Sequence, residues 1–136
     1  MTRFRIGEAA GLLGVSADTV RRWIDAEKLV AVRDQAGHRV VEGEALAAFV
    51  REQHAAADPA SETSSARNRL RGIVTAVAKD GVMAQVDLQA GPFRVVSLMS
   101  REAVDELDLR VGSVAVAVIK STTVVVETAS PGRRTA

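Results

Sequence analysis

The hydrophobic pattern of the chain changes its period across a short polar segment, residues 54–64. Before the segment, apolar residues recur at the spacing of helices, and from Leu70 onward they alternate with polar residues as in strands. The segment is acidic, rich in small residues and contains Pro59, so it cannot build a core. The sequence therefore predicts a two-domain α+β protein: domains at residues 1–53 and 65–129, a linker at 54–64 and a disordered tail at 130–136.

Composition excludes several classes of protein. The absence of cysteine excludes disulfides, thiolate metal sites and cysteine nucleophiles. The two histidines, His38 and His54, lack the spacing of zinc ligands, so no site for a bare metal ion is expected. No Gly-rich phosphate loop and no nucleophile–base pair stand out, so we do not expect an enzyme. No apolar run approaches the ~20 residues that span a bilayer, and we expect a cytoplasmic protein without a membrane partner.

The first domain has the spacing of a helix-turn-helix. Gly14 suits the end of one helix, and Ser16 suits the N-cap of the next. Two β-type runs around Gly37 predict a hairpin, or wing. The expected elements are helices over residues 6–13, 17–26 and 42–53 and hairpin strands over residues 28–33 and 38–41.

The second of these helices carries polar and basic residues on its outward side, while Trp23 shares a face with Val20 and is expected in the core. Arginine can bind guanine through two hydrogen bonds, and basic residues at a hairpin tip can contact phosphate. The net charge is only +1, so a local face rather than bulk charge would bind DNA. Arg21 and Arg22 could alternatively be solvated helix residues. The candidate DNA-binding residues are Ser16, Asp18, Thr19, Arg21, Arg22, Arg33, His38 and Arg39.

Residues 4–51 resemble the winged helix-turn-helix of the MerR and excisionase type. The matching motifs are Ala9-Ala10 before the turn, Arg21-Arg22-Trp23 on the second helix and Gly37-His38-Arg39 in the wing. The resemblance implies binding to double-stranded DNA and leaves the bound sequence open.

Alternating residues predict a small OB-like β-barrel in the second domain. Lys79-Asp80-Gly81 has the Asp-Gly signal of a tight hairpin, and Ser100 suits the N-cap of a short helix. The expected elements are five strands, over residues 72–78, 82–88, 93–99, 114–119 and 123–127, and one helix over residues 101–107.

Ser65-Ala66-Arg67-Asn68 places a hydroxyl, a guanidinium and a carboxamide in four residues. This donor-rich set suits a small oxyanion, because arginine offers a planar fork of donors and stays charged. Lys120-Ser121-Thr122 adds a second cation and more hydroxyls at the end of a hydrophobic strand. Alternatively, Arg67 and Lys120 are surface residues of a barrel without a ligand.

Residues 65–128 resemble the molbindin (Mop, or TOBE) domains. The blocks that carry the resemblance are residues 65–74, 95–100 with 103–107, and 118–122, in that order. The resemblance implies a five-stranded OB-like barrel that binds molybdate, often also tungstate, as an intact oxyanion between subunits. It implies a homo-oligomer, with a dimer as the minimum and a hexamer as a further option. The oxyanion-binding residues that it implies are Ser65, the N–H of Ala66, Arg67, Ser100, Lys120, Ser121 and Thr122.

The two resemblances together indicate a molybdate-responsive, DNA-binding transcriptional regulator. One alternative is a molbindin-type storage or homeostasis protein whose helical head serves assembly. A second alternative is an architectural DNA-binding protein whose barrel binds no oxyanion.

Overall fold

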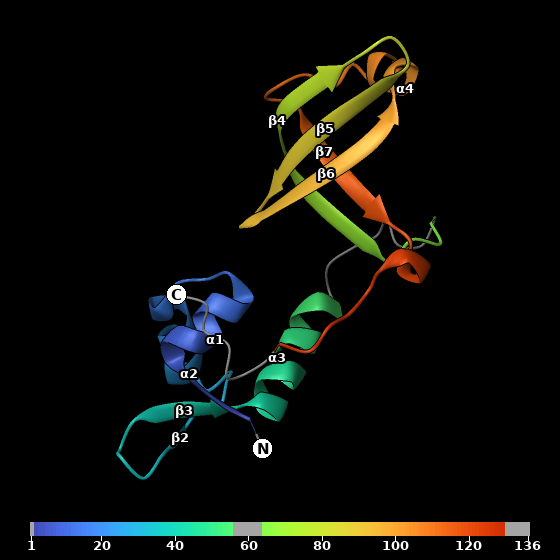
Figure 1. Cartoon of the computed structure of the whole chain (residues 1–136). Coiled ribbons are helices and arrows are strands. Elements are labelled where there is room, and N and C mark those ends of the chain that lie inside the picture. The colour runs from blue at the N-terminus through green and yellow to red at the C-terminus, as the bar shows by residue number, and fades with distance from the viewer. Residues whose placement is uncertain (1, 56–63, 130–136) are drawn as a thin grey trace. The chain divides into compact units, whose positions relative to one another are not determined.

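The computed structural model describes residues 2–55 and 64–129, without the side chains of residues 54 and 55 (Figure 1). The chain divides into two compact units, residues 1–59 and 60–136, and each is described by itself. Helices and antiparallel sheets occur together, which confirms the mixed α+β class. Most of the expected linker and all of the expected tail lie outside the described residues. Within the described ranges, no helix is both long and apolar enough to cross a membrane.

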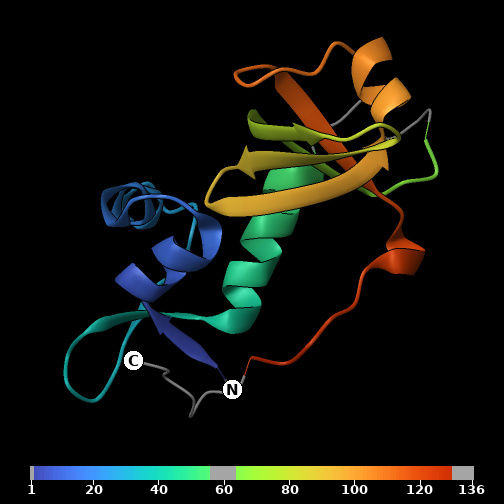
Figure 2. The same ribbon diagram turned by 45° about the horizontal axis from the view of Figure 1, so that its top comes forward.

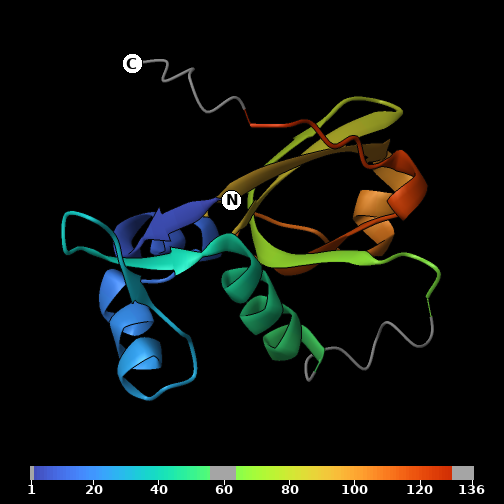
Figure 3. The same cartoon turned by 90° about the horizontal axis from the view of Figure 1, so that it is seen from below.

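The first unit combines three helices with a small antiparallel sheet in the order β1-β3-β2 (Figure 3). The strand β1 was not predicted. It pairs Phe4 with Val41 of β3, and Phe4 packs against the core while Arg3 and Arg5 lie on the other side of the strand. The elements are β1 (Arg3–Arg5), α1 (Ile6–Leu13), α2 (Ala17–Asp25), β2 (Val32–Arg33), β3 (Arg39–Glu42) and α3 (Gly43–Ala55).

Local signals begin and end the first two helices. Gly14 ends α1 with a left-handed φ of 68°, a conformation that costs glycine little. Ser16 begins α2, because its side chain accepts the backbone N–H of Thr19 at 3.1 Å. The apolar face of α2 then packs into the core, where the Trp23 and Phe49 rings have centroids 4.8 Å apart. The outward face of α2 is left to solvent.

The second unit is one curled antiparallel sheet with strand order β6-β5-β4-β7, and β7 passes behind β5 and β6 (Figures 1 and 2). The central strand β4 pairs with β7 through its first half and with β5 through its second half. A register shift between Val74 and Ala76 bends β4 between these two pairings. The elements are β4 (Asn68–Lys79), β5 (Met83–Ala90), β6 (Phe93–Ser100), α4 (Arg101–Glu106), β7 (Val114–Ile119) and the 3-10 turn η2 (Ser121–Thr123).

The expected fifth strand, residues 123–127, does not form within the chain, so that prediction is wrong for a single copy. Both the backbone N–H and the Oγ1 of Thr123 donate to the Lys120 carbonyl, at 3.0 and 2.8 Å, and close the turn η2 instead. Val125 and Val126 follow in an irregular segment and are 85% and 87% exposed. The valine-rich composition favours a strand, but a strand also needs a neighbour for its backbone groups. The described sheet therefore has four strands and free edges at β6 and β7.

A substitution at Gly72 should destabilise the second unit. A Cβ at this position would lie 2.2 Å from the carbonyl oxygen of Gln89 on β5, which is far inside van der Waals contact. We expect Gly72→Ala to lower the free energy of unfolding by ~1–3 kcal/mol, because the backbone of β4 or β5 must shift. The matched control is Gly81→Ala, where nothing lies within 4 Å of the added atom. Urea unfolding of both variants measures the difference, and equal midpoints would contradict the prediction.

The pH dependence of stability should include a contribution from Asp87. Its Oδ2 accepts hydrogen bonds from Arg94 Nη2 and Nε at 2.6 and 3.0 Å, and its Oδ1 accepts one from Gln85 at 3.1 Å. The Arg94 hydrogen bonds, followed by that of Gln85, lower the pKa of Asp87 below its usual value. A lowered folded-state pKa stabilises the protein above the unfolded-state value, near 4, and this stabilisation disappears as pH falls through the folded-state pKa.

Asp87→Asn should therefore flatten the fall in unfolding free energy between about pH 5 and 2, without removing the contributions of other carboxylates. Asp108→Asn serves as a charge-matched control, because that exposed carboxylate pairs only with nearby Arg110 among the described contacts. Urea titrations at successive pH values give the two slopes. A slope in Asp87→Asn as steep as in the parent chain would contradict the assignment.

Candidate functional site

The β4–β7 ladder brings two of the predicted oxyanion-binding segments to the same end of the sheet. Asn68, the first residue of β4, pairs with Ile119, the last residue of β7, and donates from Nδ2 to the Ile119 carbonyl at 3.2 Å. Because the strands are antiparallel, residues just before Asn68 and just after Ile119 emerge side by side. Residues 65–67 and 120–122 therefore lie together at this end, although more than fifty positions separate them in sequence.

Hydrogen bonds within residues 64–67 already fix part of this segment. The Ala66 N–H, a predicted oxyanion donor, donates instead to Ser64 Oγ at 3.1 Å, and Ala66 is buried. Arg67 donates one guanidinium N–H to the Ser64 carbonyl at 2.9 Å, which leaves its other donors available. Among the described residues, no carboxylate forms an ion pair with Arg67 or Lys120. This end of the sheet therefore carries two cations that no described carboxylate neutralises.

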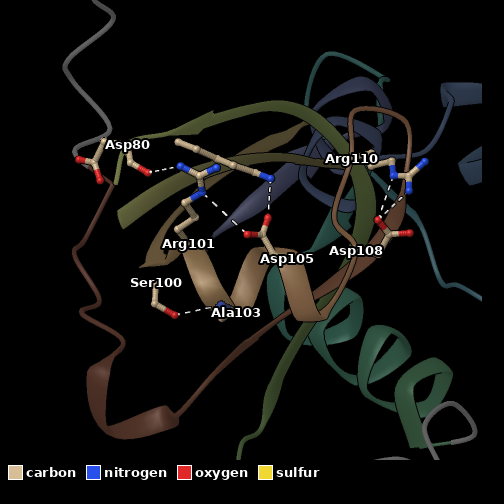
Figure 4. Close-up of polar contacts among 8 residues, drawn as sticks. Asp80, Ser100, Arg101, Ala103, Asp105, Asp108 and Arg110 are labelled. Atoms are coloured by element: carbon tan, nitrogen blue, oxygen red, sulfur yellow. Dashed lines mark hydrogen bonds and ion pairs between the residues drawn. The ribbon is translucent and has the colours of Figure 1, made fainter. Parts of the chain in front are cut away.

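Ser100 lies at the opposite end of β4. It pairs with Met83 at the start of β5, beside the β4 terminus at Lys79. The twelve residues of β4 separate the two ends by roughly 35 Å along the strand at ~3.3 Å per residue. Ser100 Oγ accepts the Ala103 N–H at 3.1 Å and caps α4 (Figure 4). One chain therefore does not bring Ser100 together with Arg67 and Lys120.

Three acidic residues of α4 lie near Ser100. A cavity of about 470 Å³ beside it is lined by Arg101 together with Glu102, Asp105 and Glu106. A hydrogen bond from Lys79 Nζ at 2.6 Å lowers the pKa of Asp105 below its usual value. Arg101 is held by the Asp80 carbonyl and by Asp105, as Figure 4 shows. This end offers a dianion little net positive charge unless another chain supplies cations.

In the first unit, the outward face of α2 presents its predicted DNA-binding residues in two hydrogen-bonded groups. Arg21 Nη1 contacts Asp18 Oδ1 at 2.7 Å, so its charge is partly neutralised. Arg22 Nη2 donates to Thr19 Oγ1 at 3.1 Å, and that hydroxyl lies 2.9 Å from Ser16 Oγ. Arg22 is held by a neutral hydroxyl, so it can meet a phosphate or a base without giving up an ion pair.

The wing is fixed by Asp34. Its Oδ1 accepts the backbone N–H groups of Ala36 and His38 at 3.0 and 2.9 Å, and these bonds, that of His38 first, lower the pKa of Asp34. Arg33 Nη1 donates to the Gly37 carbonyl at 2.6 Å across the turn. These hydrogen bonds fix the turn that positions Arg33 and Arg39.

An ion pair joins the wing to the second helix. Arg39 Nη1 on β3 lies 3.4 Å from Asp25 Oδ1 at the end of α2. Most of the predicted DNA-binding residues thus lie on α2 or on the β2–β3 hairpin, and this ion pair connects the two. Sequence reasoning missed Arg5, whose Nη2 lies 3.4 Å from His38 Nδ1. The signal for it was the Arg3-Phe4-Arg5 alternation, which is too short to stand out.

Groups of three or more His, Cys, Asp or Glu side chains suited to hold a metal ion do not occur in the described part of the chain. Hydroxyl, amide and cationic donors make up the set at residues 64–68 and 120–122. Such donors suit an anion held by hydrogen bonds rather than a coordinated cation.

Comparison with known proteins yields two family matches. A TOBE domain matches residues 64–126, and a helix-turn-helix domain matches residues 4–54. These ranges correspond to the second and first units, respectively.

Several relatives are similar to this chain over about half of its length. Molybdenum-pterin-binding protein 3 of Clostridium pasteurianum is 44% identical over 63 residues, which are 46% of this chain and 93% of that protein. Molybdenum transport protein ModE of Herbaspirillum seropedicae is 41% identical over 69 residues, 50% of this chain but only 26% of that protein. The structure of MopII from Clostridium pasteurianum shares 38% identity and a TM-score of 0.45, covering 48% of this chain and 98% of that chain. The chain belongs to the TOBE-domain family of molybdenum-pterin-binding proteins and carries a helix-turn-helix domain in addition.

Proposed function

We propose that this protein is a cytoplasmic, DNA-binding transcriptional regulator that responds to molybdate or tungstate. The observation that carries the proposal is the joint presence of a TOBE domain and a helix-turn-helix domain in one chain. The names of the relatives support the ligand, since they include molybdenum-pterin-binding proteins and ModE. The proposed boundaries are residues 1–53 for the DNA-binding domain and 65–129 for the oxyanion-binding domain.

The proposed ligand is an intact tetrahedral dianion. Arg67 and Lys120 supply two positive charges to a −2 ligand, and Ser65, Ser121 and Thr122 supply hydroxyl donors. The proximity of these two segments across the β4–β7 ladder supports the assignment. Ala66 can take part only if its N–H leaves Ser64, so we rank it below the others.

Ser100 requires a second copy of the chain. It belongs to the proposed set but lies at the far end of β4 from Arg67 and Lys120. A site that uses all of these residues must therefore combine Ser100 of one subunit with the cations of another. We propose a homo-oligomer with oxyanions at subunit interfaces, a dimer at the least and a hexamer as the larger option.

The proposed DNA contact uses α2 in the major groove and the β2–β3 hairpin as a wing. Arg21 and Arg22 would meet base edges, and Arg33 and Arg39 would meet phosphates. Two heads on adjacent major grooves would read half-sites about 34 Å apart. Molybdate would regulate binding by favouring one arrangement of the subunits, which requires different affinities for the two arrangements.

Molybdate binding should depend on Arg67 and Lys120. Isothermal calorimetry of the parent protein should show saturable heat with molybdate and much less with sulfate. Arg67→Ala and Lys120→Ala should each weaken binding by at least about tenfold, because each removes charge-assisted hydrogen bonds. Arg110→Ala removes an exposed cation that pairs with Asp108 and should leave affinity unchanged. Absence of heat from ligand-free protein would remove the oxyanion from the proposal.

DNA binding should depend on α2. If Arg22 reads a base, Arg22→Ala should weaken binding to a selected operator by about 1–3 kcal/mol. If Arg39 contacts a phosphate, Arg39→Ala should lower the slope of log affinity against log salt concentration by about 1. Gel-shift and salt titrations measure both effects, with Arg110→Ala as the charge-matched control. No DNA binding, with or without molybdate, would favour a storage protein; DNA binding that ignores molybdate would favour an architectural one.

A further inference from the structure

One ion pair on the outward face of α2 contains a carboxylate that DNA would meet directly. Asp18 lies in the first turn of the helix, and its Oδ1 accepts a hydrogen bond from Arg21 Nη1 at 2.7 Å. The Asp18 side chain is 84% exposed, compared with 49% for Arg21. An exposed carboxylate would weaken contact with phosphates, because like charges repel across an interface. Asp18 stabilises the helix N-terminus, but its pairing with Arg21 also gives it a use in reading DNA.

Both partners of this pair keep unused hydrogen-bonding groups. Among the described contacts, Asp18 accepts a hydrogen bond from Arg21 alone, so its second carboxylate oxygen is left over. Arg21 uses Nη1 in the same contacts, so Nε and Nη2 are left as donors. The two side chains lie three positions apart, which places them on the same side of the helix. The pair therefore offers an arginine fork beside a carboxylate acceptor.

We propose that Arg21 and Asp18 together read one G·C base pair in the major groove, with Asp18 as the specificity-determining residue. The major-groove edge of that base pair presents the acceptors N7 and O6 of guanine beside the N4 amino donor of cytosine. Arg21 donates to the guanine acceptors while Asp18 accepts from cytosine N4, so the ion pair need not separate. The inference rests on the proposed DNA binding through α2 and adds the base pair that this helix selects.

The carboxylate makes other base pairs costly at the same position. A C·G pair places guanine O6 opposite Asp18, and an A·T pair places thymine O4 there, so the carboxylate meets an acceptor in both cases. A T·A pair offers Arg21 one acceptor in place of two. Specificity that depends on such a penalty also disfavours binding to random DNA. Attraction to any duplex is then left to cations such as Arg22, which has no carboxylate partner among the described contacts.

Selection from DNA duplexes with a randomised core tests the inference, using the full chain with and without molybdate. The parent protein should enrich one G·C pair at a fixed position of each half-site. Replacing that pair by C·G or A·T should weaken binding of the parent by at least about tenfold. Asp18→Asn should reduce this penalty by at least about threefold, because an amide can donate to O6 or O4 as well as accept from N4. The same variant should bind unselected duplexes more tightly, because it lacks the repelling charge.

Asp25→Asn is the matched control, because it removes the same charge from the same helix. Asp25 is the last residue of α2 and pairs with Arg39. Its substitution should change the affinity for all duplexes alike and keep the preference for G·C. Arg21→Lys provides a second test if Asp18→Asn fails to fold. It keeps the charge but removes the planar fork, so it should lose the preference for G·C.

The outcomes separate this inference from the proposed function. If the parent protein enriches no duplex, DNA binding fails and the inference fails with it. If the parent enriches duplexes that share no such G·C pair, the inference alone is overturned. It is also overturned if Asp18→Asn weakens binding to selected and unselected duplexes equally, because Asp18 then serves only the helix N-terminus.

Discussion

The antiparallel hydrogen-bond ladder of β4 is the interaction on which the second unit depends. This strand pairs with β7 along its first half and with β5 along its second half, and the shift between Val74 and Ala76 bends it between the two. The same ladder sets Lys120 beside Arg67, because β4 begins where β7 ends. Gly72 allows the close approach of β4 and β5 that the curl requires. Fold and proposed ligand site therefore rest on a single strand.

In the first unit, side chains that bond to the backbone shape the proposed DNA face. Ser16 begins α2, and Asp34 fixes the wing turn through two backbone N–H groups. These bonds orient the basic side chains without covering them. Arg22 donates a hydrogen bond to a hydroxyl, whereas Arg21 and Arg39 form ion pairs with carboxylates. On binding a DNA phosphate, Arg21 and Arg39 would therefore have to break an ion pair, whereas Arg22 would break only a hydrogen bond to a hydroxyl.

Much of the fold could be predicted from local signals. The change of hydrophobic period separated the two units, and the hydroxyls of Ser16 and Ser100 marked helix starts. Non-local pairing was harder to predict. The strand β1 depends on a partner nearly forty residues away, and the expected strand at residues 123–127 has none among the described residues.

For the candidate site, sequence order indicated which segments carry donors but not how far apart they lie. Residues 65–67 and 120–122 are brought together by strand pairing, and Ser100 is carried to the other end. These distances follow from the register of strand pairing in the sheet, which the sequence pattern does not reveal. The capture of the Ala66 N–H by Ser64 is likewise a detail of one turn, which composition and spacing do not show.

The length of β4 has an evolutionary consequence. Because this strand runs between Ser100 and the two cations, its number of residues determines the distance between anion positions in any assembly that uses both ends. One inserted residue would turn every later side chain to the opposite face of the sheet unless a bulge absorbed it, as the shift between Val74 and Ala76 does. Outside such a bulge, insertions in pairs preserve the core, and each pair lengthens the strand by roughly 7 Å. The geometry of such an assembly can therefore diverge among relatives only in discrete steps.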